Sequence, residues 1–313
     1  MSLVNPQNLQ RLKFLFDLHG YVIVRNVLDK DELDSANRAI DLHEFQVRSS
    51  EGIRNASSTS PFGGGRGRMD MGGMLGWSEG QRDVFRKCLA HPNLVSVLHE
   101  LLGTGYRLDH SPLVIGQEKG SEGFELHGGS LTSDGKFIPE LQYRCKNETI
   151  YNTLLGVSFQ LSGQQLDEGG YCVVGGSHKI NFPPPKDIMN GSDSDFFRDY
   201  VHQPVTNPGD VILFSEATIH GCLPWKSDRQ RRIALYRFSP SHLAFARGYT
   251  DPSWPASFTQ GLTEEQAAVI LPPYLNMYDR PYLDENGKLS TVPRGRSQAK
   301  KDFDNQVFGA RYY

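Results

Sequence analysis

Apolar positions near the start of the chain follow the spacing of amphipathic helices. Leucines three residues apart, which fall on one face of a helix, predict a helix over residues 8–19 that ends at Gly20. Asp29, with Glu32 three residues later, forms the capping-box pattern that begins a second helix. A third leucine-rich segment ends at Gly103. We therefore expect the N-terminal third of the chain to be mainly helical.

From residue 106 onward the pattern changes to short apolar runs rich in β-branched and aromatic residues. Gly, Pro and Asp separate these runs, as is typical of turns between strands. The runs are SPLVIG (111–116), YNTLLGVSFQL (151–161), YCVV (171–174), DVILFS (210–215) and RRIALYRF (231–238). Several short strands joined by turns predict an antiparallel sandwich or barrel.

Two further segments flank or follow this pattern. Residues 55–80 contain eight glycines and little periodicity, which predicts a long loop. The role of its part 62–80 is left open between a plain surface loop and a lid that brings Arg66 and Arg68 to an acidic substrate. Closer to the C-terminus, Thr263 begins a second capping box and predicts another helix.

The composition is that of an ordinary globular protein. The chain has 313 residues, 38% of them apolar, which is enough for a sizeable core. The net charge is −3 and the basic residues are scattered, so we expect a small-molecule substrate, with no nucleic acid and no membrane as a partner. Four cysteines without a Cys-x-x-Cys pair predict free thiols in a reducing compartment. No apolar run reaches the roughly 18 residues of a membrane span, and we predict a cytoplasmic protein.

Histidines end two of the apolar runs, His127 in GFELHGG and His220 in GDVILFSEATIHG. Arg231 begins another predicted strand soon after His220, so the three side chains could share one cavity. Neutral imidazoles on neighbouring strands suit a non-haem iron site with open coordination positions. An arginine fork binds the far carboxylate of a dicarboxylate in a bidentate manner. The pattern favours iron together with a dicarboxylate co-substrate.

Four segments match, in order and spacing, segments of one known family. They are GYVIVRNVLDKDEL (20–33), DEGGYCVVGGSHK (167–179), GDVILFSEATIHG (209–221) and SDRQRRIALYRFS (227–239). Over roughly residues 12–245 the chain resembles the phytanoyl-CoA dioxygenase family of iron(II)/2-oxoglutarate-dependent oxygenases. The resemblance implies a double-stranded β-helix, a jelly-roll variant, with N-terminal helices supporting one sheet. We predict a single domain, 1–313: a mostly helical part with the glycine-rich loop (1–105), a jelly-roll core (106–245), and a C-terminal helix and tail (246–313).

The resemblance also implies roles for individual residues. His220 falls on the family's distal iron ligand, and Arg231 falls on the arginine that binds 2-oxoglutarate. Cys222 stands where a small hydroxyl residue often supports 2-oxoglutarate. Gln117 and Tyr143 stand where residues of the family's sheets line the 2-oxoglutarate pocket. The implied cofactors are Fe(II) and 2-oxoglutarate, and the reactants are O2 and a small molecule.

The chain departs from the family at the first iron motif, His-x-Asp. His127 takes the place of the histidine, and Gly129 stands at the carboxylate position. Glycine provides no ligand, so one iron position is left for water, an anion or another side chain. Members of the wider group that chlorinate aliphatic carbon carry His-x-Gly or His-x-Ala, and chloride takes the vacated position. Gly129 therefore favours a halogenase, with chloride as a further cofactor.

Two other interpretations stay open. A hydroxylase or related oxidase could work with two histidines alone, or with a carboxylate from the substrate, from Asp134, or from Glu125, which has the same strand parity as His127. The chain could also be an inactive binding protein that has lost its iron. The presence of both histidines and of Arg231 at compatible positions speaks against that loss.

Overall fold

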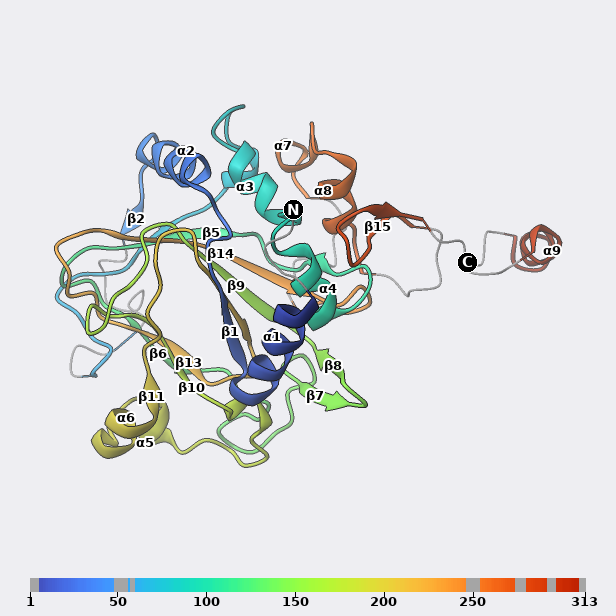
Figure 1. Ribbon diagram of the computed structural model, residues 1–313. Coiled ribbons are helices and arrows are strands. Elements are labelled where there is room, and N and C mark those ends of the chain that lie inside the picture. The colour runs from blue at the N-terminus through green and yellow to red at the C-terminus, as the bar shows by residue number, and fades with distance from the viewer. Residues whose placement is uncertain are drawn as a thin grey trace.

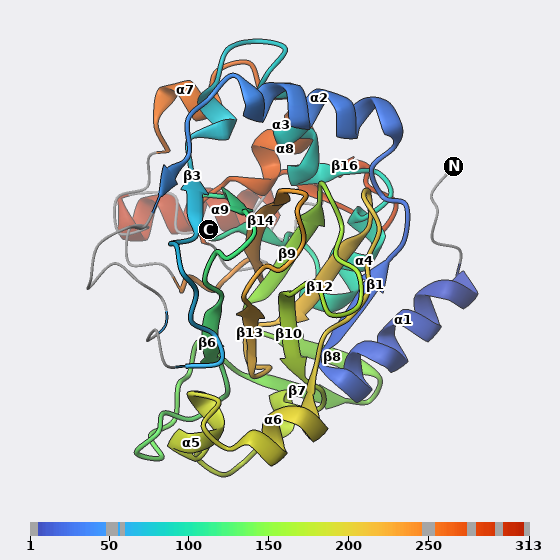
Figure 2. The same ribbon diagram turned by 90° about the vertical axis from the view of Figure 1, so that its left-hand side faces the viewer.

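Helices cover one side of a large antiparallel sheet, and a smaller sheet faces its other side (Figures 1 and 2). The computed structural model describes residues 6–47, 56, 60–245, 254–273, 280–291 and 297–309. The three helices predicted in the N-terminal third are confirmed as α1, α2 and α4. Within the described residues the helices are α1 (Pro6–His19), α2 (Lys30–Asp41), η1 (Met74–Gly76), α3 (Asp83–Lys87), η2 (Cys88–Ala90), α4 (Val95–Leu102), η3 (Ser177–Lys179), α5 (Lys186–Met189), α6 (Ser194–Tyr200), α7 (Ala256–Thr259), α8 (Glu264–Val269) and α9 (Gln298–Phe308).

The strands β5, β6 and β9 to β14 pass back and forth between the two sheets, which is the connectivity of a double-stranded β-helix. The predicted jelly-roll fold is therefore confirmed. In sheet order the large sheet contains β1 (Tyr21–Val24), β12 (Val211–Ser215), β9 (Leu155–Gln160), β14 (Arg231–Ser239), β5 (Leu113–Gln117), β3 (Met69–Met71) and β2 (Gln46–Val47), with β4 (Arg107–Leu108) beside β14. The small sheet contains β11 (Val201–His202), β10 (Gly170–Val174), β13 (His220–Leu223) and β6 (Phe124–His127). Two separate hairpins are β7 (Tyr143–Lys146) with β8 (Thr149–Asn152), and β15 (Tyr282–Leu283) with β16 (Leu289–Ser290).

The large sheet is buried on both faces, which explains why its strands read as continuous apolar runs. On β12, Val211 and Leu213 belong to the core cluster beneath the helices. Ile212 and Phe214, which alternate with them, belong to the cluster between the two sheets. On β14, Ile233 also faces the small sheet. Every second residue along β14 is therefore directed to the interior between the sheets.

Both predicted capping boxes are present. The Asp29 side chain accepts a hydrogen bond from the Glu32 backbone N–H at 2.9 Å, and the Glu32 carboxylate accepts one from the Asp29 N–H at 2.9 Å. Thr263 and Gln266 make the same reciprocal pair at the start of α8. Each cap satisfies backbone N–H groups that the first turn leaves free, and contributes about 1 kcal/mol.

The glycine-rich segment 62–80 differs from the predicted long loop, because it contains β3 and η1. Met69 and Met71 are buried in β3, which pairs with β5 at one side of the large sheet. An alternation three residues long does not stand out in a sequence rich in glycine, and pairing with β5 stabilises it. Arg68 is consequently held at the sheet and nearly buried, whereas Arg66 is exposed.

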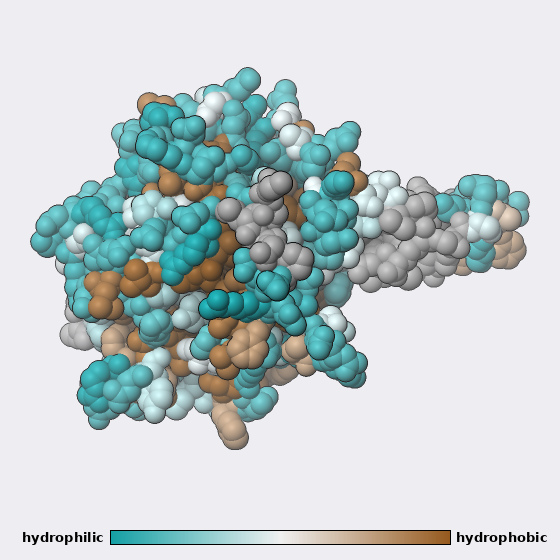
Figure 3. Space-filling view, viewed as in Figure 1, coloured by the Kyte–Doolittle hydropathy of each residue, from teal (hydrophilic) through white to brown (hydrophobic). Residues whose placement is uncertain are grey.

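The surface in Figure 3 is mainly hydrophilic, and apolar residues gather in patches beside α1 and along β1. There α1 and β1 line a hollow of about 550 Å³. Among the described helices, none combines the length and the apolar character that a membrane crossing requires. Of the basic segment 293–301, residues 293–296 lie outside the described residues, and the remainder leads into α9.

Candidate active site

The pairing of β6 with β13 places His127 directly opposite His220. The centroids of their imidazole rings lie 4.2 Å apart. The register shifts after this pair, because Cys222 pairs with Phe124, and the resulting irregularity is a β-bulge. It directs both Phe124 and His127 into the space between the sheets, where regular alternation would separate them. Two histidines far apart in the sequence are thus side by side.

Both imidazoles present a free lone pair. Nδ1 of His127 lies 3.0 Å from the carbonyl oxygen of Glu125, and Nδ1 of His220 lies 2.7 Å from that of Thr218. A carbonyl oxygen only accepts, so Nδ1 carries the proton in each ring and Nε2 is left unprotonated. Burial lowers the pKa of both histidines, and the neighbouring His220 helps to lower that of His127 to about 3. Neutral imidazoles with an available Nε2 are the form that binds metal ions.

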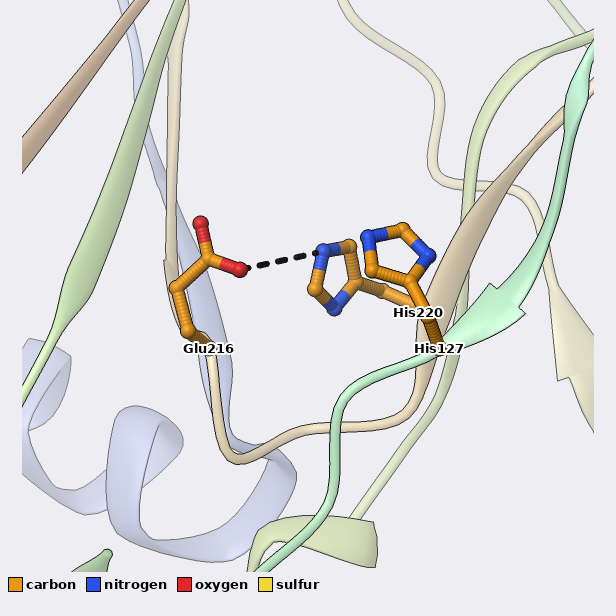
Figure 4. Close-up of side chains that lie close together, drawn as sticks. All are labelled: His127, Glu216 and His220. Atoms are coloured by element: carbon orange, nitrogen blue, oxygen red, sulfur yellow. Dashed lines mark ion pairs between the residues drawn. The ribbon is translucent and has the colours of Figure 1, made fainter. Parts of the chain in front are cut away.

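A carboxylate joins the two histidines. Glu216 lies in the turn between β12 and β13, and ligand atoms of His127, Glu216 and His220 all lie within 4.8 Å of one another (Figure 4). Its Oε1 accepts a hydrogen bond from Nε of Arg237 at 2.5 Å, and its Oε2 lies 3.6 Å from Nε2 of His220. Burial alone would raise the pKa of Glu216, but Arg237 and the two histidines lower it to about 2. The carboxylate is therefore ionised at neutral pH.

A cavity of about 160 Å³ lies between the sheets beside these residues, and Arg231, Tyr171 and Arg68 help to line it. Arg231 is buried and donates from Nη1 to Oε1 of Gln117 at 2.9 Å, while its Nε has no hydrogen-bond partner. No carboxylate of the described residues forms an ion pair with Arg231. The hydroxyl of Tyr171 is also buried without a partner. Such groups are costly to bury alone, so together they fit an anionic ligand.

Comparison with known protein families identifies the chain. The family model described as phytanoyl-CoA dioxygenase (PhyH) matches residues 16–233. The chain belongs to the phytanoyl-CoA dioxygenase family. The predicted resemblance is therefore confirmed over most of the sequence. No curated protein matches this family member.

Solved structures share the fold of this phytanoyl-CoA dioxygenase family member. HygX from Streptomyces hygroscopicus, solved with nickel, 2-oxoglutarate and hygromycin B, matches with a TM-score of 0.61 and 19% identity, over 78% of this chain and 90% of that chain. The epimerase SnoN, solved with Fe3+, alpha ketoglutarate and nogalamycin RO, matches with a TM-score of 0.56 and 17% identity, over 87% of this chain and 98% of that chain. At these identities the likeness establishes the fold alone.

Gly129 stands where the family pattern has an acid, and its backbone conformation favours glycine. Gly128 and Gly129 both have φ of +93°, which residues with a side chain rarely adopt. A Cβ on Gly129 would have Ile219 Cγ1 at 3.8 Å and the Leu131 carbonyl oxygen at 3.9 Å, and no histidine atom within 4 Å. Glycine at 129 therefore suits a backbone conformation that residues with a side chain rarely adopt.

The two carboxylates proposed from the sequence lie elsewhere. Glu125 was placed with His127 by strand parity, but the β-bulge breaks that parity and Phe124 lines the cavity instead. Asp134 has an exposed side chain that forms an ion pair with Lys136 at 2.7 Å. Within the described part of the chain, the carboxylate grouped with the two histidines belongs to Glu216.

Gln117 and Cys222 both contact Arg231, and their role toward 2-oxoglutarate stays a prediction. Gln117 accepts the hydrogen bond from Arg231, and Sγ of Cys222 lies 3.8 Å from the same Nη1. Gln117 is oriented in turn, because its Nε2 donates to the backbone oxygen of Glu122 at 2.8 Å. These contacts hold the guanidinium at the cavity.

Tyr143 does not line the cavity, and this prediction is corrected. It lies on β7, in a hairpin outside the two core sheets. Its hydroxyl donates to Asp17 of α1 at 2.6 Å, and its ring packs edge-on against His178, with centroids 4.4 Å apart. The hairpin is inserted between β6 and β9 and carries Tyr143 away from the interior. The tyrosine that reaches the cavity is Tyr171 on β10.

Sequence reasoning also missed Glu216 and Arg237. Arg237 is six residues after Arg231 on β14, so strand alternation could have placed both on the inner face. Glu216 is four residues before His220 in SEATIHG, but a turn, not a strand or helix, separates the two. The shape of that turn decides where the carboxylate lies, and periodicity does not encode it.

Replacing Gly128 with alanine is expected to destabilise the protein more than replacing Gly129. Both alanines would be strained by the backbone, at about 1–3 kcal/mol each. At Gly128 the new Cβ would also lie 2.5 Å from the Thr218 carbonyl oxygen and 2.8 Å from that of Glu216, which adds about 1–3 kcal/mol of overpacking. Denaturant unfolding of the two variants measures the difference. Equal losses of stability would show that the turn of Glu216 does not pack tightly against Gly128.

Proposed function

We propose that this chain is an iron(II)/2-oxoglutarate-dependent oxygenase that hydroxylates an aliphatic C–H bond of a small molecule. One observation carries the proposal: two neutral histidines and a carboxylate lie in the same interior as a buried arginine that lacks an anionic partner. The donor set fits a 2-His-1-carboxylate iron site with open positions. The Nε of Arg231 and the hydroxyl of Tyr171, both without a hydrogen-bond partner, fit a dicarboxylate beside it.

The residues around the cavity would have separate roles in binding iron and 2-oxoglutarate. Nε2 of His127 and Nε2 of His220 would hold the iron, and backbone carbonyls at their Nδ1 atoms keep both rings in the required tautomer. Bound iron, together with 2-oxoglutarate and O2, supplies the oxidising power for C–H cleavage. Arg231 would pair with the distal carboxylate of 2-oxoglutarate, and the Tyr171 hydroxyl would donate a hydrogen bond to it. Apolar side chains such as Phe214 also line the cavity.

Halogenation is less well supported than hydroxylation. A halide replaces the iron-binding carboxylate only where that carboxylate is absent, and Glu216 provides an ionised carboxylate next to both histidines. A chloride beside it would add like-charge repulsion in a buried site. Gly129, which suggested the halide, does not line the cavity. An inactive descendant without iron is also disfavoured, because His127, Glu216 and His220 still bring ligand atoms within 4.8 Å of one another.

Turnover with and without chloride tests the proposal. Purified protein receives Fe(II), 2-oxoglutarate and O2, with a panel of small molecules that begins with hygromycin B and nogalamycin RO, the compounds bound in HygX and SnoN. We expect succinate, and a product that has gained one oxygen atom, at the same rate in chloride-free buffer. A chlorinated product would establish a halogenase instead. Absence of succinate with every compound, and also without any, would contradict the enzymatic proposal.

A further inference from the structure

We propose that Glu216 is the third protein ligand of the metal, in place of the acid that is missing at Gly129. The metal motif of this chain would then be His127 with Glu-x-x-x-His (Glu216 to His220), instead of His-x-Asp with a distant histidine. This inference rests on the proposed function, because it assumes that His127 and His220 bind iron. It goes further by assigning the position that the family pattern leaves vacant.

The geometry between Glu216 and His220 calls for a cation. Nδ1 of His220 donates to the Thr218 carbonyl oxygen, so its Nε2 is a hydrogen-bond acceptor. Oε2 of Glu216, which also only accepts, lies 3.6 Å from that Nε2, a separation too long for a hydrogen bond. Two buried acceptors that face each other repel, and a metal ion between them turns the repulsion into coordination. Figure 4 shows the carboxylate directed toward both rings.

The two oxygens of Glu216 have different surroundings, as a monodentate ligand requires. Arg237 holds Oε1, which fixes the orientation of the carboxylate and leaves Oε2 available to a metal. A purely structural ion pair is the alternative. An ion pair alone would not require the carboxylate to be buried beside the two imidazoles. The Glu216 side chain is only 8% exposed, whereas the Arg237 side chain is 23% exposed.

The fold positions this turn firmly against the HGG segment. The Glu216 N–H donates to the Leu154 carbonyl oxygen at 3.0 Å, and the Thr218 hydroxyl donates to the Gly20 carbonyl oxygen at 3.0 Å. On the other side, the Glu216 carbonyl oxygen would lie 2.8 Å from a Cβ on Gly128. The glycine after His127 therefore lets the turn approach closely. The glycines after His127 and the position of Glu216 beside the histidines are therefore parts of the same local packing.

Binding of Co(II) to the apoprotein, followed by calorimetry and by visible absorption, tests the inference without any turnover. We expect the wild type to bind one Co(II) per chain. Glu216→Gln keeps the size of the side chain but removes a charged ligand, so we expect Co(II) affinity to fall by at least about 100-fold, beyond the 10–100-fold typical of outer-shell changes. The matched control is Arg237→Gln, which removes the ion pair but keeps the ligand. Its loss of Co(II) affinity should stay within the 10–100-fold range of an outer-shell change, and below the loss in Glu216→Gln.

The outcomes separate this inference from the proposed function. Unchanged Co(II) affinity and an unchanged Co(II) spectrum in Glu216→Gln would overturn the role of Glu216, while the two-histidine site would stand. Absence of Co(II) binding by the wild type would overturn the proposed function itself. Equal losses in Glu216→Gln and Arg237→Gln would show that the ion pair is structural. If Glu216→Gln is unstable because Arg237 loses its partner, the double variant Glu216→Gln with Arg237→Gln removes that charge, and we expect it to fold and to lose Co(II) binding.

Discussion

Replacing Arg231 with methionine is expected to weaken 2-oxoglutarate binding by about 30-fold or more, since loss of one partner of a buried charge pair costs roughly 2–5 kcal/mol. Arg231 is buried at the cavity, and no carboxylate of the described residues neutralises it. Methionine preserves the apolar stem of the side chain and removes the fork that binds a carboxylate. Calorimetric titration of 2-oxoglutarate into the Co(II)-loaded protein measures the loss.

The adjacent Arg232 provides the matched control. It points to the opposite face of β14, where Nη2 forms an ion pair with Asp41 at 2.6 Å. Arg232→Met should bind 2-oxoglutarate as the wild type does. If the Arg232 variant loses binding and the Arg231 variant keeps it, the register of β14 is shifted by one residue and the assignment is wrong.

Removal of either histidine is expected to abolish stoichiometric metal binding. His127→Ala and His220→Ala each delete an imidazole whose Nε2 is available to a metal. Loss of a metal ligand should reduce metal affinity more than loss of an outer-shell contact, which reduces it 10–100-fold. The metal content per chain after dialysis measures the effect. His202→Ala is the control, because His202 lies on β11 of the same sheet with an exposed side chain. A histidine variant that still retains one metal per chain would contradict the assignment.

The sequence predicts the fold well where patterns are local. The run at 210–215 becomes β12 and the run at 231–238 becomes β14, because a strand buried on both faces needs continuous apolar residues. The Asp29 and Thr263 capping boxes begin helices as predicted, since the cap depends on residues three positions apart. Strand β3 is missed, because three residues among glycines carry too little periodicity.

The candidate site is harder to predict, since it depends on register and on turns. The proximity of His127 to His220 requires the pairing of β6 with β13 and the bulge beside it, neither of which a local pattern encodes. Because of that bulge, Glu125 does not share a face with His127, as strand alternation had predicted. Tyr143 fails for a different reason, because an inserted hairpin removes it from the core. Glu216 could be suggested from Glu-x-x-x-His only if the shape of the intervening turn were known.

Anaerobic titration of 2-oxoglutarate into the Fe(II)-loaded protein tests most directly whether iron and 2-oxoglutarate share this cavity. Chelation of Fe(II) by 2-oxoglutarate gives a visible charge-transfer absorption. We predict that this absorption rises to saturation at one 2-oxoglutarate per chain in the wild type and in Arg232→Met. It should be absent in His220→Ala, and strongly reduced in Arg231→Met at the concentration that saturates the wild type. A wild type that binds Fe(II) and 2-oxoglutarate without this absorption, or an Arg231→Met variant with the wild-type titration, would contradict the proposed site.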